Sequence, residues 1–102
     1  MAAYIVVNVE ITNPEQYKSY LREVEASVRA YGGRYLIRGG PTEILEGDFT
    51  PRRFVVLEFA DATTARAWWS SDEYAPAKRI RQASARTDMF LAEGYDTPAA
   101  TR

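Results

Sequence analysis

The sequence predicts an α+β fold, with an antiparallel sheet and helices packed on one of its faces. Two observations support this prediction. Residues 3–11, 53–59 and 87–93 alternate between apolar and mixed side chains, as strands with two different faces do. Residues 14–31 and 61–84 instead repeat apolar side chains at three- and four-residue spacing, which is typical of amphipathic helices.

The first predicted strand is followed by a long helix. Asn13 can cap that helix, Pro14 suits its first position, and Gln16 stands where a capping box places a glutamine. Gly32 can take the left-handed conformation that ends a helix. A short strand over residues 34–38 follows. The apolar stripe of the helix consists of Tyr17, Tyr20, Leu21, Val24, Val28 and Tyr31.

The sequence pattern after residue 40 predicts two or three further strands and a pair of helices. Extended character resumes over residues 42–46, between turns rich in glycine and proline. Residues 53–59 are apolar and β-branched at their centre, as a buried strand is. Asp61 can cap a short helix and Ser71 can cap a second one, which favours a kinked pair. Residues 87–93 form the last predicted strand.

This order of elements predicts a ferredoxin-like split βαβ topology when the crossovers are right-handed. The 102 residues fit one domain, which we expect over residues 1–95. Residues 96–102 are rich in proline, alanine and threonine and are predicted to form a flexible tail.

The predicted strands have a second face that is neither polar nor fully apolar. The first face contains Ala3, Ile5, Val7, Val9, Ile11, Val55, Leu57, Phe59, Met89 and Leu91. The second contains Tyr4, Val6, Asn8, Glu10, Phe54, Val56, Glu58, Asp88, Phe90 and Ala92. Such a mixture suits neither bulk water nor burial under helices, so it predicts a homodimer with sheet packed on sheet and a wet cleft inside. The alternative is a monomer with a solvated sheet face.

The composition excludes several classes of function. Cysteine and histidine are absent, which removes thiol nucleophiles, the commonest general base and the usual zinc and haem ligands. We therefore expect no cofactor and no metal site. A net charge of −1 from 13 basic and 14 acidic residues argues against a nucleic-acid partner. The absence of a long apolar run and of a signal-like N-terminus predicts a cytoplasmic protein without membrane association.

Several blocks of the sequence are similar to those of a known family. They are residues 30–40 (AYGGRYLIRGG), 46–48 (EGD) with 51–59, and 67–74 (AWWSSDEY) with Arg81 and Gln82. In the same order, they resemble blocks of the family called domain of unknown function 1330, and the resemblance covers residues 3–95.

That resemblance implies a dimeric α+β barrel made of two ferredoxin-like sheets, and it implies no activity, because the family is uncharacterised. Related barrels include cofactor-free quinone-forming monooxygenases, isomerase-like and dehydratase-like enzymes, haem-degrading enzymes and ligand modules of transcription regulators. Tyr31 stands where many relatives have histidine, so any role of that histidine is absent here.

Polar side chains of the second sheet face are the candidate catalytic residues. We expect Asn8, Arg38 and Glu58 to converge there. A carboxylate in a semi-apolar cleft can act as a general acid or base, and a guanidinium beside flexible glycines can clamp a carboxylate or an enolate. The alternative is that these groups form hydrogen bonds and ion pairs between subunits, with Arg38 paired to Glu46 or Glu58.

Aromatic and basic side chains supply the candidate ligand contacts. Tyr74 and Arg81 share one helical face, and we expect them to close over the entrance of the cleft. Trp68 and Trp69 are adjacent and cannot share a face, so one belongs to the core and the other lines a pocket or meets the partner subunit. The predicted ligand-binding residues are Tyr4, Phe54, Trp68, Tyr74 and Arg81.

Two functions fit these features. The first is a cofactor-free enzyme, monooxygenase-like or isomerase-like, that acts on a small carbonyl or aromatic metabolite. It rests on fold analogy, and it leaves the chemistry to Glu, Asp, Tyr and Arg side chains. The alternative is a non-catalytic dimer that binds a small-molecule ligand or serves a structural role.

Overall fold

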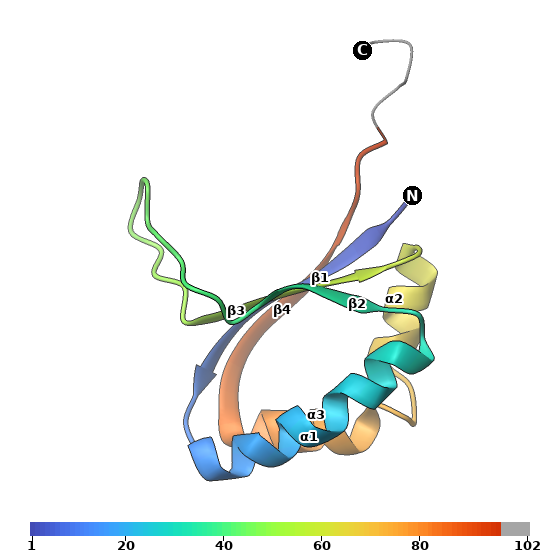
Figure 1. The fold of residues 1–102 in the computed structure, drawn as a ribbon, viewed down its shortest axis with the longest axis horizontal. Coiled ribbons are helices and arrows are strands. Elements are labelled where there is room, and N and C mark those ends of the chain that lie inside the picture. Colours follow the sequence, from blue (N-terminus) through green and yellow to red (C-terminus); the bar gives the residue numbers. More distant parts are fainter. Residues whose placement is uncertain (97–102) are drawn as a thin grey trace.

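The computed structural model describes residues 1–96 as two layers, a four-stranded sheet and three helices (Figure 1). The strands are β1 (Ala3–Ile11), β2 (Arg34–Arg38), β3 (Arg53–Phe59) and β4 (Ala85–Glu93). The helices are α1 (Pro14–Ala30), α2 (Ala62–Trp69) and α3 (Ala75–Ser84). The strand order is β2-β3-β1-β4 with antiparallel neighbours, and the helices lie on one side of the sheet. This is the predicted ferredoxin-like fold.

The predicted boundaries of α1 and the start of α2 are confirmed by their capping groups, whereas α3 begins at Ala75, after the predicted cap Ser71. The Asn13 side chain accepts a hydrogen bond from the amide of Gln16 at 3.1 Å. Asp61 accepts one from the amide of Thr64 at 2.8 Å. Gly32 follows α1 with a φ of 70°, a left-handed conformation that glycine adopts without steric cost. These local contacts explain why α1 and α2 begin, and α1 ends, where the sequence indicates.

The two faces of the sheet differ as the alternating pattern predicts. The apolar face lies under the helices and is buried there, with Ile5 opposite Leu57 and Val7 opposite Val55. The outer face places Tyr4 opposite Glu58 and is half-buried or exposed along its length. The core therefore lies between the sheet and the helices, and the semi-polar face points away from them.

A continuous aromatic stack runs through the core between the sheet and the helices. The ring centroids of Phe59 and Trp68 lie 5.4 Å apart, and those of Trp68 and Tyr74 lie 4.1 Å apart. Tyr20 meets Tyr74 edge-on at 6.5 Å, and Tyr17 lies 5.2 Å from Tyr20. The stack joins α1, α2 and the start of α3 to the end of β3, so it places tyrosine hydroxyls inside the domain.

The extended segment predicted over residues 42–46 is not a strand. It belongs to the loop between β2 and β3, which rises from the sheet on the side opposite the helices (Figure 1). Gly39 turns the chain with a φ of 73°, and Pro41 lacks the amide that a ladder requires. Leu45 is 88% exposed, since no neighbouring strand or helix of the described chain covers it.

The last strand begins at Ala85, two residues earlier than predicted, because α3 runs into β4 without a connecting loop. The carbonyl of Ser84 accepts hydrogen bonds from the amides of Thr12 and Asn13 at 2.9 and 3.0 Å. At the other end of the strand, the amide of Gly94 donates to the carbonyl of Ala2 at 2.7 Å. Both ends of β4 are thereby tied to the ends of β1.

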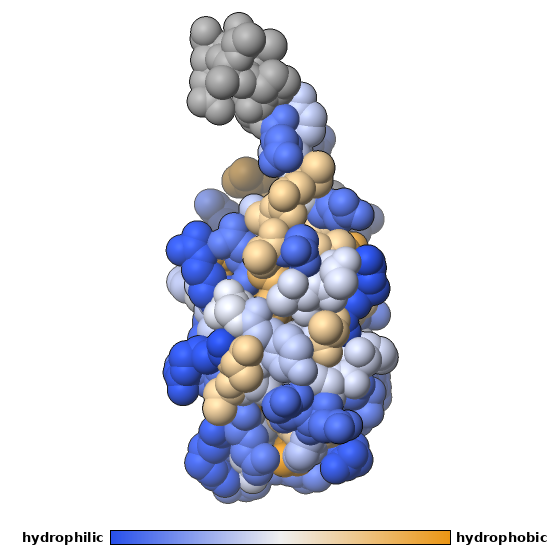
Figure 2. All heavy atoms as spheres, turned by 90° about the vertical axis from the view of Figure 1, so that its right-hand side faces the viewer, coloured by the Kyte–Doolittle hydropathy of each residue, from blue (hydrophilic) through white to orange (hydrophobic). Residues whose placement is uncertain are grey.

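The surface of the described residues offers few large apolar features on the side shown in Figure 2. That side is predominantly hydrophilic; a strip of apolar atoms lies toward the chain termini, and smaller apolar spots lie below it. Among residues 1–96, no helix combines the length and hydropathy needed to cross a membrane. Of the tail predicted over residues 96–102, only Asp96 belongs to the described residues.

Candidate functional site

The outer face of the sheet brings together two of the predicted site residues. Glu58 accepts a hydrogen bond from the Arg34 Nε at 2.6 Å and a longer one from the Tyr4 hydroxyl at 3.4 Å. Arg34 was missed by the sequence analysis, although it is the residue that faces Glu58 across β2 and β3. The carboxylate of Glu58 is therefore already engaged by an arginine of its own chain.

Asn8 lies on the same face but does not join Glu58. In the ladder it stands opposite Phe54, whereas Glu58 stands opposite Tyr4, four residues away along β1. At about 3.3 Å per residue, that separation is about 13 Å. The Asn8 side chain instead accepts a hydrogen bond from the amide of Arg52 at 2.7 Å, which fixes the end of the β2–β3 loop.

Arg38 does not lie on the outer face, contrary to the prediction. A bulge between Tyr35 and Ile37 inserts one residue, so Arg34 faces outward and Arg38, opposite Val55, faces the helices. Its guanidinium stacks 4.0 Å from the centre of the Tyr35 ring and forms an ion pair with Glu25 of α1 at 3.2 Å. The predicted pairing with Glu46 or Glu58 is therefore wrong.

Trp68, Tyr74 and Arg81 also lie on the helix side of the sheet and not at the entrance of an outer cleft. The predicted ambiguity between the tryptophans is resolved, because Trp68 is 0% exposed and belongs to the core. Trp69 is partly exposed, and Lys78 lies 3.7 Å above its ring. The predicted site is thus divided by the sheet into an outer group and an inner group.

The inner side contains a cavity of about 510 Å³ between α2, α3 and β4. Its walls are mainly apolar, and it is lined by Ile5, Ala65, Arg66, Trp69, Ser70, Arg81, Gln82, Thr87, Met89, Phe90 and Leu91. Arg81 is only 5% exposed. The buried hydroxyl of Thr87 has no hydrogen-bond partner among the described residues. The cavity therefore combines an apolar wall with hydrogen-bonding groups that are not fully used.

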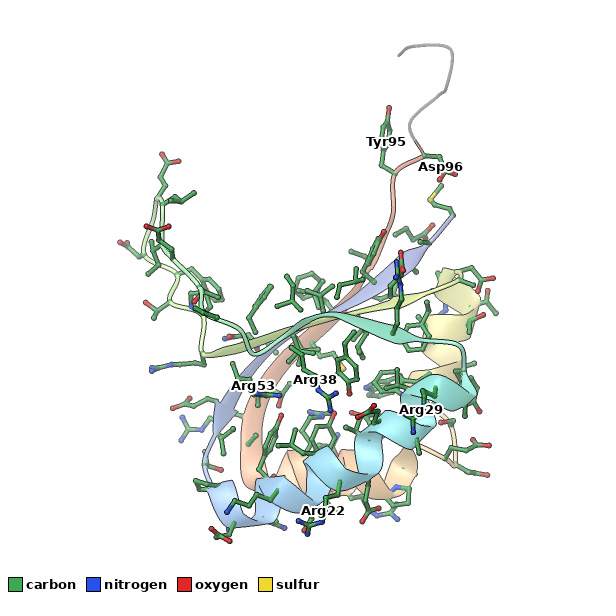
Figure 3. The ribbon with its side chains drawn as sticks, in the orientation of Figure 1. Arg22, Arg29, Arg38, Arg53, Tyr95 and Asp96 are labelled. Carbon is green, nitrogen blue, oxygen red and sulfur yellow. The ribbon has the colours of Figure 1, made fainter. Side chains whose placement is uncertain are left out.

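A second, smaller cavity of about 20 Å³ lies between the sheet and α1. Arg81 and Met89 line both cavities, so the two are neighbours. Figure 3 shows the side chains of Arg38 and Arg53 pointing into the space between the sheet and α1. The other lining residues are Val7, Val9, Tyr17, Tyr20, Leu21, Val24, Tyr35, Val55, Leu57 and Trp68.

A chain of hydroxyl groups connects Arg81 to α1. The Nε of Arg81 donates to the Tyr74 hydroxyl at 3.2 Å, and that hydroxyl lies 3.1 Å from the Tyr20 hydroxyl. One proton joins the two tyrosines, so the other hydroxyl proton has no acceptor in this chain of groups. Burial raises the pKa of Tyr20 far above its ordinary value, with the nearby Tyr74 adding to the shift.

The electrostatic surroundings of Tyr17 differ from those of Tyr20. Burial raises the pKa of the Tyr17 hydroxyl, while the positive charges of Arg53 and, more weakly, Arg81 oppose that rise. Both guanidiniums therefore act on one hydroxyl. The inner group can bind and orient an oxygen-bearing ligand through arginine and tyrosine donors. No set of three or more acidic, histidine or cysteine side chains within residues 1–96 is placed to hold a metal ion.

The two-layer architecture and the strand order make this an α+β protein with a ferredoxin-like fold, and the sequence shows its family. The profile of the family described as domain of unknown function (DUF1330) matches residues 2–95. This chain belongs to that family. No curated protein matches it.

Solved structures share this fold at low sequence identity. The protein of unknown function RPA0582 from Rhodopseudomonas palustris has a TM-score of 0.76 and 16% identity, covering 94% of this chain and 84% of that one. A dimeric ferredoxin-like protein of unknown function from Jannaschia sp. CCS1 has a TM-score of 0.69 and 15% identity, covering 92% and 100%. SnoaB, a cofactor-independent oxygenase from Streptomyces nogalater, has a TM-score of 0.64 and 13% identity, covering 96% and 97%.

Proposed function

We propose that this protein is a homodimer that binds a small carbonyl or aromatic metabolite in the larger inner cavity and transforms it without a tightly bound cofactor. The observation that carries the proposal is the cavity of about 510 Å³. Its size falls in the range of small-molecule sites, which are typically about 300–1,000 Å³, apolar and furnished with a few polar groups. Arg81 and Thr87 are such groups.

Cofactor-free chemistry is supported by the residues that surround the cavity. In the absence of histidine and cysteine, Arg81 is the buried donor of the cavity wall best suited to orient a carbonyl or phenolic oxygen, and its Nε also bonds to the Tyr74 hydroxyl behind that wall. The fold shared with SnoaB is consistent with this class of activity, although at 13% identity that likeness concerns the fold alone.

The dimer is proposed to form through the outer face of the sheet. Val6, Phe54 and Val56 occupy the middle of that face and are half-buried, and Phe90 beside them is exposed. A contiguous apolar strip of this kind favours burial against a second copy. The dimeric neighbour from Jannaschia sp. CCS1 shares the fold. In such a dimer, the predicted site residues Tyr4, Asn8 and Glu58 serve the interface.

A non-catalytic binding protein is the second candidate, and one observation favours it. The raised pKa of Tyr20 keeps its phenol protonated at neutral pH, so this hydroxyl is a donor and not a general base. Among the described residues, no carboxylate lies within 4.0 Å of Arg66 or Arg81, the two arginines that line the cavity. A site with donors but without a base holds a ligand more readily than it removes a proton from it.

The two candidates are separated by ligand binding followed by turnover. A panel of phenols, 1,3-dicarbonyl compounds and aromatic acids would be tested by thermal shift and calorimetry, and oxygen uptake and product formation measured for each hit. We expect Leu91→Trp, which fills the cavity, to abolish binding of the hits, while Ala67→Trp on the exposed face of α2 retains it. Binding without turnover would favour the non-catalytic protein, and binding unaffected by Leu91→Trp would contradict the site.

A further inference from the structure

Two arginines on the inner side of the sheet, Arg53 and Arg81, lack a carboxylate partner among the described residues, whereas two arginines of β2 have one. Arg34 is paired with Glu58, and Arg38 with Glu25. Within residues 1–96, neither Arg53 nor Arg81 has a carboxylate oxygen within 4.0 Å. A guanidinium removed from water without an opposite charge is unfavourable, so an uncompensated pair in one place indicates that a negative group is accommodated there.

Arg53 is half-buried, and the backbone around it holds its guanidinium against the sheet. It is the first residue of β3, and its Nε is buried without a hydrogen-bond partner among the described residues. Gly39 lies directly against the guanidinium, and a Cβ at that position would collide with the Arg53 Nη1. The glycine thus leaves the room that the guanidinium occupies, in addition to allowing the positive φ of the turn.

Arg53 and Arg81 converge although they come from opposite layers. Arg53 enters from the sheet and Arg81 from α3, and both line the smaller cavity. Both also act on the hydroxyl of Tyr17, whose pKa each of them lowers against the effect of burial. The smaller cavity is therefore a place where two positive charges and tyrosine hydroxyls meet.

We propose that the two inner cavities form one bipartite site for an organic anion. The anionic oxygen, of a carboxylate or an enolate, occupies the smaller cavity between Arg53 and Arg81, and the apolar or aromatic body occupies the larger cavity. This inference rests on the proposed function and specifies its ligand class. Arg38 also lines the smaller cavity, but it differs from Arg53 and Arg81 in having a carboxylate partner, Glu25, which it shares with Arg29.

The dimensions of the cavities match this division. A volume of about 20 Å³ has the room of about one water molecule, which is enough for the oxygen end of a ligand and too small for its body. Arg81 and Met89 form the boundary, since they line both cavities. A planar guanidinium at that boundary can donate to the anion on one side while its flank contacts the apolar body on the other.

The experiment compares an anionic probe with its neutral isostere. The affinities of 2-naphthoate and 2-naphthamide for the full chain would be measured by calorimetry. We expect naphthoate to bind about tenfold or more tightly than naphthamide, since hydrogen bonds to charged groups contribute that much. Arg53→Gln and Arg81→Gln should both remove most of this difference, and Arg53→Gln, at a position that does not line the larger cavity, should leave the affinity for naphthamide within about twofold. Arg79→Gln, an exposed arginine of α3, is the matched control and should change neither affinity.

A second measurement places the anion. The Arg53 Nε–H resonance should shift on addition of naphthoate and stay unchanged with naphthamide. If Arg81→Gln fails to fold, Arg53→Gln and this resonance decide alone. Equal affinities of the two probes for the wild-type protein, or equal losses for both probes in Arg53→Gln, would overturn the anion site while the proposed function stands. Absence of binding by both probes would count against the proposed function and the inference together.

Discussion

The two sides of the sheet differ in how their charged side chains are paired. On the outer face, Glu58 is met by Arg34 at 2.6 Å, so the pair is complete within the chain. On the inner side, Arg53 of β3 and Arg81 of α3 have no carboxylate partner among residues 1–96. The comparison therefore agrees with the proposed roles, an interface on the outer face and a ligand site on the inner side.

The largest expected effect comes from placing one charge on each face of β3. Val55→Asp buries a carboxylate among the helices and should lower the free energy of unfolding by about 3 kcal/mol or more, enough to unfold the domain. Val56→Asp, on the outer face, should dissociate the proposed dimer and leave a folded monomer. Urea denaturation and sedimentation velocity distinguish the two results, and identical behaviour of both variants would refute the assignment of the faces.

The next effect concerns alkaline pH, at which the free energy of unfolding should fall because buried tyrosines ionise. Burial holds the pKa values of Tyr17, Tyr20 and Tyr35 above the ordinary 10.0. The unfolded chain releases these protons from about pH 10, while the folded chain keeps them. Stability should therefore be constant below that pH and fall above it, by about 1.4 kcal/mol per pH unit for Tyr20.

The measurement is urea denaturation at pH values from 8 to about 11, with absorbance at 295 nm to follow phenolate formation. Tyr20→Phe should make the decline shallower, and Tyr95→Phe, at an exposed position, should leave it unchanged. A decline of the same slope in the wild type and Tyr20→Phe would show that Tyr20 ionises without unfolding the domain.

The smallest effect is expected for the outer ion pair. The side chain of Arg34 is 71% exposed and that of Glu58 is 23% exposed, so water screens the attraction between them. Glu58→Gln should change the free energy of unfolding of the monomer by about 0–1 kcal/mol. Asp88→Asn, an exposed outer-face carboxylate, is its control. A loss of several kcal/mol in Glu58→Gln would mean that the outer pair supports the fold itself.

Much of the fold was predictable because its signals are local. Asn13 and Asp61 cap their helices by contacts within three residues, and the alternation along β1 and β3 separates buried from semi-polar side chains. The segment over residues 42–46 was not predictable in this way. It has apolar residues suited to a strand, yet a strand also needs a neighbour with which to pair, and that is a property of the whole sheet.

The candidate site was predicted only in part, and the bulge in β2 is the main reason. Without the inserted residue, Arg34 and Arg38 would share a face, as the sequence analysis assumed in placing Arg38 beside Glu58. Nothing within those five residues marks a bulge. The tyrosines of α1 offered a usable signal, because buried Tyr17 and Tyr20 hydroxyls require polar neighbours, which an all-apolar core would not supply.

The pairing of β1 with β4 brings the two ends of the described chain together. Ala3 stands opposite Glu93, and the amide of Gly94 bonds to the carbonyl of Ala2. The chain can therefore be reconnected at these ends and opened elsewhere without changing how the strands and helices pack. A circular permutant that joins these ends by a short linker and opens within the β2–β3 loop retains every strand pair and both inner cavities. Its new ends lie on the far side of the sheet from these cavities.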